Sequence, residues 1–334
     1  MTPSSPTTTL VTGGAGYIGM PACAELAASG RRVRVLDNLL HGQRDAAAVL
    51  RDGGVELLVG DIRDPATRAA AVAGVDEVVH LAAIVGDPAC AVDPALANEV
   101  NVEGSRGLVR DARAAGVARM VFASTCSNYG RMADPTVPIT EEGTLAPVSL
   151  YAEQKVGIER ALLDEDPASG DPGHLLPTCL RFATVYGAAP RMRFDLTVNE
   201  FTRDLWADKH LEVFGEQFWR PYVHVRDVAR AVRLVLDTPE EKVGRRVFNV
   251  GRSGENYRKL DLVTEIAART DRGQVSFVQR TEDPRDYKVS FDRIRDELGF
   301  ETTMTVPDGI AEILAGLEAG TFGDAFARTH RNTD

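Results

Sequence analysis

The sequence predicts an α/β fold in which a smaller C-terminal lobe is interleaved with a doubly wound parallel sheet. Three observations support this class. Short apolar segments alternate with helix-compatible segments as far as residue 123, a glycine-rich turn follows the first apolar segment, and the predicted strands end at small or polar residues. Strands that alternate with helices at this rhythm favour a parallel sheet covered by helices on both faces, which is the Rossmann-type arrangement.

The first half of the chain supplies five strands, expected at residues 10–11, 32–36, 55–59, 77–83 and 119–123. Helices are expected between them at residues 22–28, shortly after Asp45, at 66–73 and at 94–115. Ligands of such sheets bind at the carboxyl ends of the strands. The residues at these ends are Gly13, Asp37, Asp61, Ala82 and Ser124.

The second half of the chain is less regular. After a long loop at 128–149, helices are expected at residues 151–163, 196–207, 227–236, 260–268, 292–298 and 307–317. Strands are expected at residues 178–185, 211–214, 222–225, 246–250 and 275–278. We therefore expect a Rossmann domain at residues 1–185, whose sheet is completed by a segment near 222–250, and a substrate-binding lobe at residues 186–330.

Composition excludes several classes of function. The 334 residues carry a formal net charge of −11, whereas general nucleic-acid binding needs a basic face. The cysteines (Cys23, Cys90, Cys126 and Cys179) show no C-x-x-C spacing, so neither a zinc site nor a disulfide framework is expected. No apolar run approaches a membrane span, and the first six residues lack the pattern of a signal peptide. We expect a cytoplasmic protein without nucleic-acid, membrane or metal partners.

The glycine-rich turn predicts a dinucleotide site. Gly14, Gly16 and Gly19 have G-x-G-x-x-G spacing between a strand and a helix, so the backbone can approach a pyrophosphate that the helix N-terminus also attracts. Asp37 ends the next strand, where a carboxylate accepts both ribose hydroxyls of an adenosine and repels a 2′-phosphate. NAD is therefore expected rather than NADP, and Arg44 is the one nearby cation that would favour NADP. The alternative is a purely structural strand–turn–helix.

Tyr151 and Lys155 form a candidate proton-transfer pair. They are four residues apart and face the same side of a helix. A tyrosine is a poor base at neutral pH, but an adjacent ammonium stabilises its phenolate. Thr125 follows Ser124 at the end of a strand, where its hydroxyl could share the reacting oxygen of a substrate with Tyr151.

Together these motifs resemble the extended short-chain dehydrogenase/reductase family, in its nucleotide-sugar epimerase/dehydratase branch. The resemblance covers nearly the whole chain and is carried by TGGAGYIG (12–19), Asp37-Asn38, GDIRD (60–64), HLAA (80–83), Asn101, SxxxxYG (124–130), YAEQK (151–155), LRFATVYG (180–187) and RPYVHVRDVARA (220–231). It implies NAD that stays bound while a hydride leaves a sugar carbon, usually C4, and returns to it through a transient ketone. It also implies a homodimer formed by the helices around 98–115 and 151–163, with Leu108, Ile158 and Leu162 at its centre.

The resemblance assigns roles to individual residues of this chain. Tyr151 would be the base, assisted by Thr125 and Lys155, and Asp61 and Ile62 would lie at the adenine. The implied cofactor-binding residues are Gly13, Gly16, Tyr17, Ile18, Gly19, Asp37, Asn38, Asp61, Ile62, Leu81, Ala82, Ala83, Asn101, Ser124, Tyr151 and Lys155. The implied substrate-binding residues are Thr125, Thr184, Asn199, Val213, Phe214, Arg220 and Arg285.

Five of these substrate residues have a structural alternative. Arg220 and Arg285 would bind the nucleotide diphosphate or be solvated surface charges. Val213 and Phe214 would line the nucleobase pocket or belong to a buried strand. Asn199 would contact pyrophosphate or sugar, or lie on a helix surface.

The chain departs from the family pattern at three places. Family 4,6-dehydratases follow the catalytic threonine with an Asp-Glu pair, and Cys126 and Ser127 stand at those positions here. Cys126 is either a general acid near the sugar or a buried, inert thiol. Thr184 stands where an asparagine commonly contacts the substrate, and residues 84–86 form an apolar floor where other members often place polar residues. We expect His80 and His224 to be structural.

Three functions follow from these observations. The first is an NAD-dependent nucleotide-diphosphate-sugar epimerase acting at C4. The second is a sugar-nucleotide dehydratase of unusual type, with Cys126 as proton donor. The third is a non-catalytic NAD-binding sensor or scaffold, which the intact Tyr151 and Lys155 argue against.

Overall fold

The computed structural model describes residues 6–132, 134, 137–164, 174–278 and 285–332. The chain forms two compact units, each assembled from three stretches. The first unit comprises Met1–Ser124, Ser149–Leu180 and Ala229–Val247, and the second comprises Thr125–Val148, Arg181–Val228 and Phe248–Asp334. The domain boundary at 185/186 that the sequence suggests stays a prediction.

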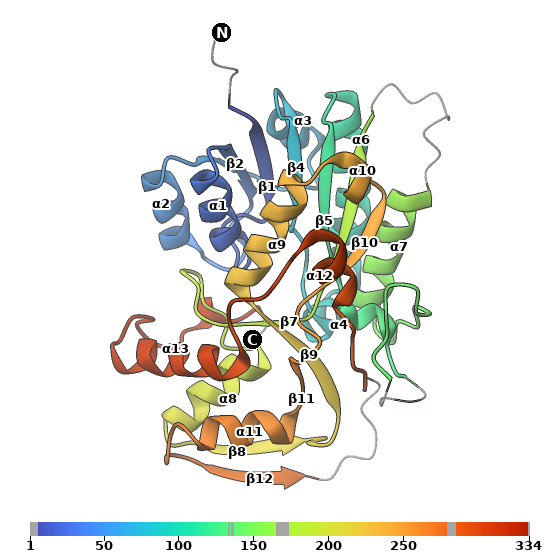
Figure 1. Cartoon of the computed structure of the whole chain (residues 1–334). Coiled ribbons are helices and arrows are strands. Elements are labelled where there is room, and N and C mark those ends of the chain that lie inside the picture. The colour runs from blue at the N-terminus through green and yellow to red at the C-terminus, as the bar shows by residue number, and fades with distance from the viewer. Residues whose placement is uncertain (1–5, 133, 135–136, 165–173, 279–284, 333–334) are drawn as a thin grey trace. The chain divides into compact units, whose positions relative to one another are not determined.

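The main sheet has seven strands in the order β10-β6-β5-β4-β1-β2-β3. Their bounds are β1 Thr8–Thr12, β2 Arg32–Asp37, β3 Glu56–Val59, β4 Glu77–His80, β5 Arg119–Thr125, β6 Leu176–Phe182 and β10 Arg246–Val250. Strand β1 pairs in parallel with both β2 and β4, with Thr9 opposite Val33 and Glu77. The sheet therefore grows in both directions from β1, and ligands of doubly wound sheets bind at such a switch point. The predicted fold class is confirmed, and Figure 1 shows the sheet with its helices.

Helices of the first unit follow the predicted order with two differences. Their bounds are α1 Gly19–Ala28, α2 Arg44–Asp52, α3 Pro65–Val72, α4 Asp87–Val92, α5 Pro94–Asn98, a π-helical turn η1 Glu99–Gly104, α6 Ser105–Ala114, α7 Leu150–Asp164, α9 Val225–Asp237 and α10 Glu240–Val243. The predicted helix at 94–115 is thus divided by the π turn, and the short helices α4 and α10 were not predicted. The side chain of Arg44 lies outside the described part.

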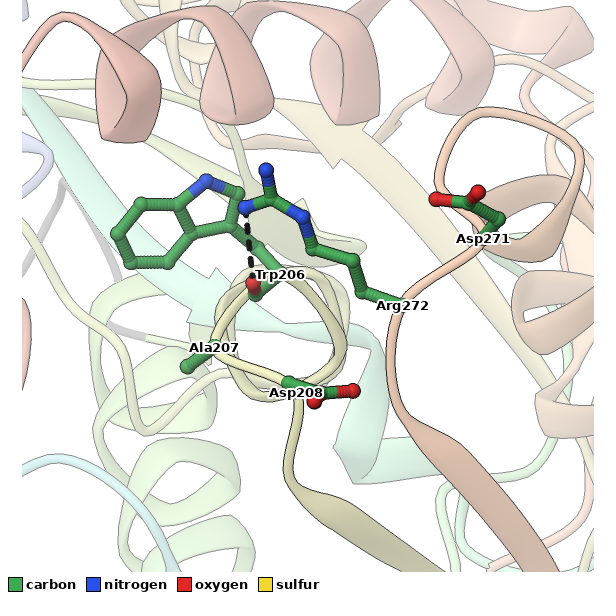
Figure 2. Close-up of a pocket in the computed structure, with 5 residues that line it drawn as sticks. All are labelled: Trp206, Ala207, Asp208, Asp271 and Arg272. Atoms are coloured by element: carbon green, nitrogen blue, oxygen red, sulfur yellow. Dashed lines mark hydrogen bonds between the residues drawn. The ribbon is translucent and has the colours of Figure 1, made fainter.

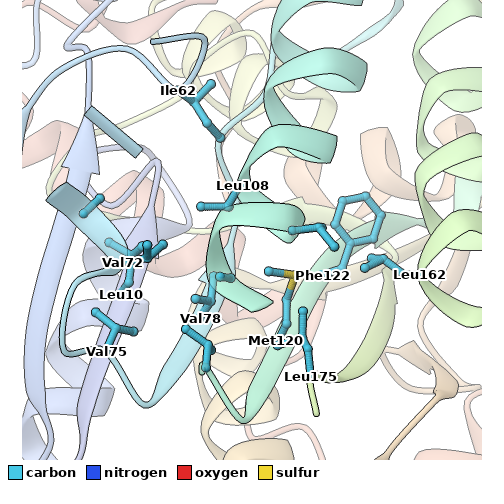
Figure 3. Packing of buried hydrophobic residues seen from close by; sticks show 14 of the residues in the cluster. Leu10, Ile62, Val72, Val75, Val78, Leu108, Met120, Phe122, Leu162 and Leu175 are labelled. Atoms are coloured by element: carbon cyan, nitrogen blue, oxygen red, sulfur yellow. The ribbon is translucent and has the colours of Figure 1, made fainter. Parts of the chain in front are cut away.

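Three helices, α3, α6 and α7, share one apolar core with the sheet. Leu10, Val78, Met120 and Phe122 of the strands meet helix residues such as Leu108 and Leu162 there, as Figure 3 shows. Burying each of these large side chains stabilises the fold by roughly 1.5–3 kcal/mol. Helix α1 lies beside α9, where Glu25 and Arg233 form an ion pair of 2.9 Å.

The three residues predicted to form the centre of a dimer contact are wrong. Leu108, Ile158 and Leu162 are between 0% and 3% exposed and belong to the core of the first unit. Helical spacing revealed an apolar face on each helix, but that face packs inward against the sheet. The outward faces of α6 and α7 instead carry charged residues, among them Arg106, Arg110, Glu153 and Arg160.

A half-buried arginine side chain joins two distant stretches of the first unit. Arg119, at the start of β5, donates to the backbone oxygens of Val235, Leu236 and Thr238 over 2.7–3.0 Å. These are the carbonyls that a helix C-terminus leaves without intrahelical partners. Arg119 therefore closes the end of α9.

The second unit is built on small sheets and three packed helices. Strand β9 Trp219–His224 lies between β7 Thr184–Tyr186 and β11 Asn256–Arg258, and β8 His210–Phe214 pairs in parallel with β12 Gln274–Val278. Its helices are η2 Cys126–Tyr129, α8 Thr197–Trp206, α11 Lys259–Ala267, α12 Asp292–Leu298, α13 Val306–Glu318 and η3 Arg328–His330. Side chains of α8, α11 and α13 pack with β7, β8 and β9 in one core.

One predicted strand is divided between the two sheets. The predicted strand at 178–185 ends as β6 at Phe182 and resumes as β7 at Thr184. Between them, the Ala183 N–H donates to the Val250 carbonyl over 3.1 Å, while Thr184 pairs with Tyr222 of β9. The change of pairing partner, which no local pattern reveals, divides the strand.

Within the described residues, no helix combines the length and apolar character needed to cross a membrane. The same residues contain no group of three or more His, Cys, Asp or Glu side chains arranged to hold a metal ion. The four cysteines are buried free thiols.

Candidate active site

Two glycines allow the turn after β1 to lie against its neighbours. Gly13 has φ +74°, and a Cβ there would lie 2.8 Å from the Ala82 backbone nitrogen. A Cβ on Gly19 would lie 2.3 Å from the Gly13 carbonyl oxygen. Any side chain at either position would push the turn away from the sheet and from the N-terminus of α1. The turn therefore has the close-fitting backbone that a pyrophosphate site needs.

The N-terminus of α1 is electrostatically suited to an anion. Helix α1 begins at Gly19, has no side-chain cap and carries no acidic residue in its first turn. Its first backbone N–H groups and the positive end of the helix dipole therefore remain uncompensated by side chains. Tyr17 is buried and Ile18 half-buried at this end.

Asp37 organises the adenosine end of the predicted cofactor site. One carboxylate oxygen accepts from the Ala15 N–H over 3.0 Å, and the other accepts from the Leu39 N–H over 2.8 Å. A carboxylate oxygen can accept more than one hydrogen bond, so the group can also accept from ribose hydroxyls. Asp37 as a whole residue is 8% exposed.

Asn38 and Asp61 lie next to one another at the ends of β2 and β3. The Asn38 amide donates to Asp61 over 3.4 Å, and Arg63 donates to both oxygens of Asp61. Hydrogen bonds from Arg63 hold the pKa of the Asp61 carboxyl below its usual range. Ile62 follows with its side chain in the core, 6% exposed, and its carbonyl oxygen accepts from Arg68.

The residues after β4 are held by β1 and by the π turn. The Leu81 and Ala82 N–H groups donate to the backbone oxygen and the hydroxyl of Thr12, over 3.1 and 3.3 Å. The Asn101 side chain bonds both the N–H and the carbonyl of Ile84, over 2.8 and 3.0 Å. The segment from 81 to 84, which includes Ala83, is therefore fixed at both ends.

Helix α7 carries the predicted proton-transfer pair. The ammonium nitrogen of Lys155 lies 5.9 Å from the centre of the Tyr151 ring and 4.7 Å from the centre of the Phe122 ring. It donates to the Ala123 carbonyl over 2.8 Å. Burial lowers the pKa of Lys155 to about 8, so the group is still mostly charged at neutral pH. A cation in this position favours the phenolate of Tyr151, which is half-buried.

Ser124, predicted at the cofactor, also ties β5 to α7. Its hydroxyl donates to the Glu159 carboxylate over 2.6 Å, and both residues are at most 3% exposed. Glu159 lies one helical turn after Lys155, so Tyr151, Lys155 and Glu159 share one face of α7. Sequence reasoning missed Glu159, although its spacing from Lys155 repeats that of Tyr151.

The second unit begins at Thr125, the last residue of β5, and continues with Cys126. The Thr125 hydroxyl accepts from the Ser127 N–H over 3.1 Å, which leaves its own proton to donate. Cys126 is 1% exposed, and its thiol donates to the Arg181 carbonyl over 3.3 Å. This geometry favours the inert of the two roles predicted for Cys126.

Asn199 is buried rather than on a helix surface. Its Oδ1 accepts from the Gly187 N–H over 3.0 Å, and its Nδ2 donates to the Arg193 carbonyl over 2.9 Å. At 0% exposure the side chain holds the chain that follows β7. Thr184, at the start of β7, is half-buried.

Arg220 and Arg285 lie in the same neighbourhood of the second unit. Burial raises the pKa of both Tyr222 and Tyr287, and the positive charges of Arg220 and Arg285 oppose this shift at both phenols. The Arg220 guanidinium carbon lies 5.4 Å from the centre of the Tyr287 ring. Arg220 is 8% exposed, so its charge is not that of a solvated surface arginine. Two nearby guanidiniums are suited to a diphosphate.

Val213 and Phe214 occupy the carboxyl end of β8. Val213 is 0% exposed and belongs to the core of the second unit. Phe214 is half-buried, and its carbonyl accepts from the Lys259 ammonium over 2.6 Å. Any nucleobase contact from Val213 would therefore involve its backbone.

A pocket elsewhere in the second unit contains none of the predicted site residues. It has a volume of about 540 Å³ and is lined by Trp206, Ala207, Asp208, Asp271 and Arg272, as Figure 2 shows. An Arg272 guanidinium nitrogen donates to the Trp206 carbonyl over 3.4 Å. The residues that line this pocket do not combine a nucleophile with a general base.

Comparison with known proteins is consistent with this geometry. Residues 9–251 match the model of the NAD dependent epimerase/dehydratase family. The UDP-glucose 4-epimerase of Corynebacterium glutamicum is 31% identical over 309 residues, which are 87% of this chain and 89% of that protein.

Solved structures of the same kind share the fold. The Thermus thermophilus UDP-glucose 4-epimerase in complex with NAD is 27% identical and has a TM-score of 0.81, covering 93% of this chain and 99% of its own. DesIV, a dTDP-glucose 4,6-dehydratase from Streptomyces venezuelae with NAD and TYD bound, is also 27% identical, with a TM-score of 0.83 over 95% of this chain and 99% of its own.

Proposed function

The chain belongs to the NAD dependent epimerase/dehydratase family, and from that premise we propose that it is an NAD-dependent nucleotide-diphosphate-sugar epimerase acting at C4 of the sugar. The observation that carries the proposal is the Tyr151–Lys155 pair, whose buried ammonium lies 5.9 Å from the phenol ring. Both residues belong to the unit that contains the glycine turn and Asp37. The curated relative is a UDP-glucose 4-epimerase, so UDP-hexoses are the first substrates to test.

NAD fits the residues present because the turn leaves no room for a side chain at Gly13 or Gly19, so its backbone can lie close to a pyrophosphate. The turn and the α1 N-terminus would hold its pyrophosphate, and Asp37 would hold its adenosine ribose. When bound, NAD accepts a hydride from the sugar carbon and returns it.

The chain's own side chains supply the proton transfer. Tyr151, as phenolate, takes the proton of the sugar hydroxyl, and Lys155 stabilises that phenolate. Thr125 would assist by donating a hydrogen bond to the sugar, without transfer of its own proton. Arg220 and Arg285 hold the diphosphate, which leaves the sugar ring able to turn and present its other face. These roles of individual residues are part of the proposal.

A mutation series tests this mechanism. Tyr151→Phe keeps the ring and removes the base, so turnover should fall by about 10²–10⁴-fold while bound NAD is retained. Thr125→Ala should cost less, because it removes a hydrogen bond and not the base. UDP-glucose and UDP-galactose should interconvert without change of mass. A Tyr151→Phe variant with full activity on the true substrate contradicts the mechanism.

The competing dehydratase reaction is distinguished by Cys126. Dehydration removes one water from the product, whereas epimerisation leaves its mass unchanged. Since the Cys126 thiol donates to the Arg181 carbonyl, Cys126→Ser should leave turnover near normal. A collapse of turnover with retained NAD, together with a product lighter by one water, would favour the dehydratase. UDP-, dTDP-, GDP- and CDP-sugars should each be tested by thermal shift and mass spectrometry.

We also propose a homodimer in the cytoplasm. The dimer contact would use the outward faces of α6 and α7, where Arg106, Arg110, Glu153 and Arg160 are exposed. A polar contact of this kind should weaken with salt. Light scattering at micromolar concentration in low and high salt tests it, and a monomer under both conditions argues against it.

A further inference from the structure

A buried chain of hydrogen bonds runs through the first unit, with His80 at its centre. The Thr12 hydroxyl oxygen lies 2.8 Å from His80 Nδ1, and His80 Nε2 lies 2.8 Å from the Ser105 hydroxyl oxygen. Ser105 in turn donates to the Asn101 carbonyl over 2.7 Å. These four residues are between 0% and 4% exposed, so the chain is shielded from solvent.

The direction of every bond in this chain follows from its chemistry. A carbonyl oxygen only accepts, so the single hydroxyl proton of Ser105 goes to Asn101. His80 must therefore donate to Ser105 from Nε2–H. A neutral imidazole has one N–H, so Nδ1 accepts from the Thr12 hydroxyl, whose oxygen accepts from the Ala82 N–H over 3.3 Å.

The surroundings of His80 keep the ring in this neutral form. Burial lowers the pKa of His80 to about 3, and the charge of Lys155 acts in the same direction. Phe122 contacts both groups: its ring centre lies 5.7 Å from that of His80 and 4.7 Å from the Lys155 ammonium. His80 is thus next to the catalytic helix without reaching a substrate.

Asn101 extends the chain to α7. Its Nδ2 donates to the Gln154 side-chain oxygen over 2.8 Å, and Gln154 immediately precedes Lys155. Asn101 lies in the π turn, and its side chain also holds the segment at Ile84. At the other end, Thr12 immediately precedes Gly13 of the glycine turn. One continuous path therefore joins that turn, the π turn and the helix that carries Tyr151 and Lys155.

We propose that His80, as its Nε2–H tautomer, is a positioning residue that sets the glycine turn and the Asn101–Gln154 pair, and through them Lys155, in register with one another. The inference rests on the proposed function, because it takes Tyr151 and Lys155 as the reacting pair. From the sequence, the histidine of the HLAA motif was expected only to be structural. The inference gives it a defined tautomer and a defined direction of hydrogen bonding.

Variants of the NAD-loaded enzyme test this role. His80→Phe keeps an aromatic ring and removes both nitrogens. Ser105→Ala keeps the hydrogen bond between His80 and Thr12 and removes the path from His80 to Asn101. His80→Asn keeps an acceptor for the Thr12 hydroxyl and is too short to replace the bond from His80 to Ser105. Thr178→Val is the matched control, since Thr178 is 3% exposed and donates to the Val243 carbonyl over 2.8 Å outside the chain.

We expect His80→Phe and Ser105→Ala to lower kcat for UDP-sugar epimerisation by about 10-fold or more, with KM changed less than about 3-fold. His80→Phe should also lose NAD on gel filtration. The kcat of His80→Asn should fall between those of His80→Phe and the unaltered enzyme, and Thr178→Val should keep its kcat. A loss of kcat in His80→Phe no larger than in Thr178→Val overturns the inference.

A second measurement needs no enzymatic activity. Long-range ¹H–¹⁵N NMR of histidine-labelled holoenzyme should show His80 as an Nε2–H ring that does not titrate between about pH 5.5 and 8.5, a range that covers the usual histidine pKa. His224 should give a similar signal, because its Nδ1 accepts from the Arg226 N–H and burial lowers its pKa to about 4. The signal is assigned by its absence in His80→Phe or His80→Asn. An Nδ1–H or titrating His80 overturns the inference. If the unaltered enzyme converts no nucleotide sugar, the proposed function fails, while the tautomer and NAD retention still decide the role of His80.

Discussion

Replacement of Lys155 by methionine should make the protein more stable and inactive. Burial lowers the pKa of Lys155 from 10.5 to about 8, which corresponds to about 3 kcal/mol at ~1.4 kcal/mol per unit. Methionine has a similar length and no charge, but it loses the hydrogen bond to the Ala123 carbonyl, worth about 1 kcal/mol. The net gain for Lys155→Met at neutral pH is therefore about 2 kcal/mol.

The gain should depend on pH in a defined direction. The unfolded lysine titrates near 10.5 and the folded one near 8, so between these values the unfolded state binds more protons. The stability of the unaltered protein therefore rises with pH across this interval. The advantage of Lys155→Met is complete below pH 8, shrinks above it, and reverses to a deficit of about 1 kcal/mol near pH 10.5.

Urea unfolding of the cofactor-free proteins at about pH 7 and about pH 9.5 measures this difference. Cofactor must be absent because bound NAD would stabilise the folded state, and Lys155 is a proposed part of its site. Lys242→Met, on the exposed helix α10, is the matched control and should leave the unfolding free energy unchanged at both values. A Lys155→Met variant less stable than the unaltered protein at pH 7 would refute the reasoning.

Further changes separate packing from function. Gly157→Ala should raise the unfolding free energy by about 1 kcal/mol, because Gly157 is exposed within α7 and no atom lies within 4 Å of a new Cβ; a loss in urea unfolding would contradict this. Gly187→Ala should lower it by about 2 kcal/mol or more, since Gly187 has φ +106° and the new Cβ would lie 2.1 Å from His224 Nε2; an unchanged melting temperature would be incompatible with that clash. Asp37→Asn should shift the NADP/NAD affinity ratio towards NADP about tenfold, because the charge is removed and an acceptor for Ala15 remains; cofactor titration that gives the same ratio would argue against Asp37 as the determinant.

Local patterns were sufficient for most of the main sheet. Alternation of short apolar segments with helices places β1 to β5 near their observed bounds, because buried parallel strands need nearly continuous apolar residues. The π turn at Glu99–Gly104 was not predictable, since helical spacing on both sides of it looks continuous. Likewise, the division between β6 and β7 depends on Val250, far along the chain, which pairs with Ala183.

Candidate site residues could be proposed where a sequence motif marks them. Residues that act only by hydrogen bonding to these could not be proposed from the sequence. Gly13, Asp37 and Lys155 were selected from spacing alone, and their roles at a cofactor stay predictions. Glu159 and Gln154 could not, because their importance lies in bonds to Ser124 and Asn101 that only the folded chain forms. Leu108 illustrates the opposite error: an apolar helical face shows that a residue is buried, not what buries it.

The assembly of the first unit from three distant stretches has a consequence for synthesis on the ribosome. Strands β1 to β5 are complete at Thr125, but β6 and β10, which extend the sheet beyond β5, emerge much later. Until Phe182 has left the exit tunnel, β5 is an open edge, and from then until Val250 has left it, β6 is the open edge. Arg119 lacks the end of α9 that it closes until Thr238 has emerged. We expect nascent chains stalled before Val250 to be cleaved readily by protease and held by chaperones. The gene therefore cannot be shortened from its 3′ end to yield the cofactor-binding half alone.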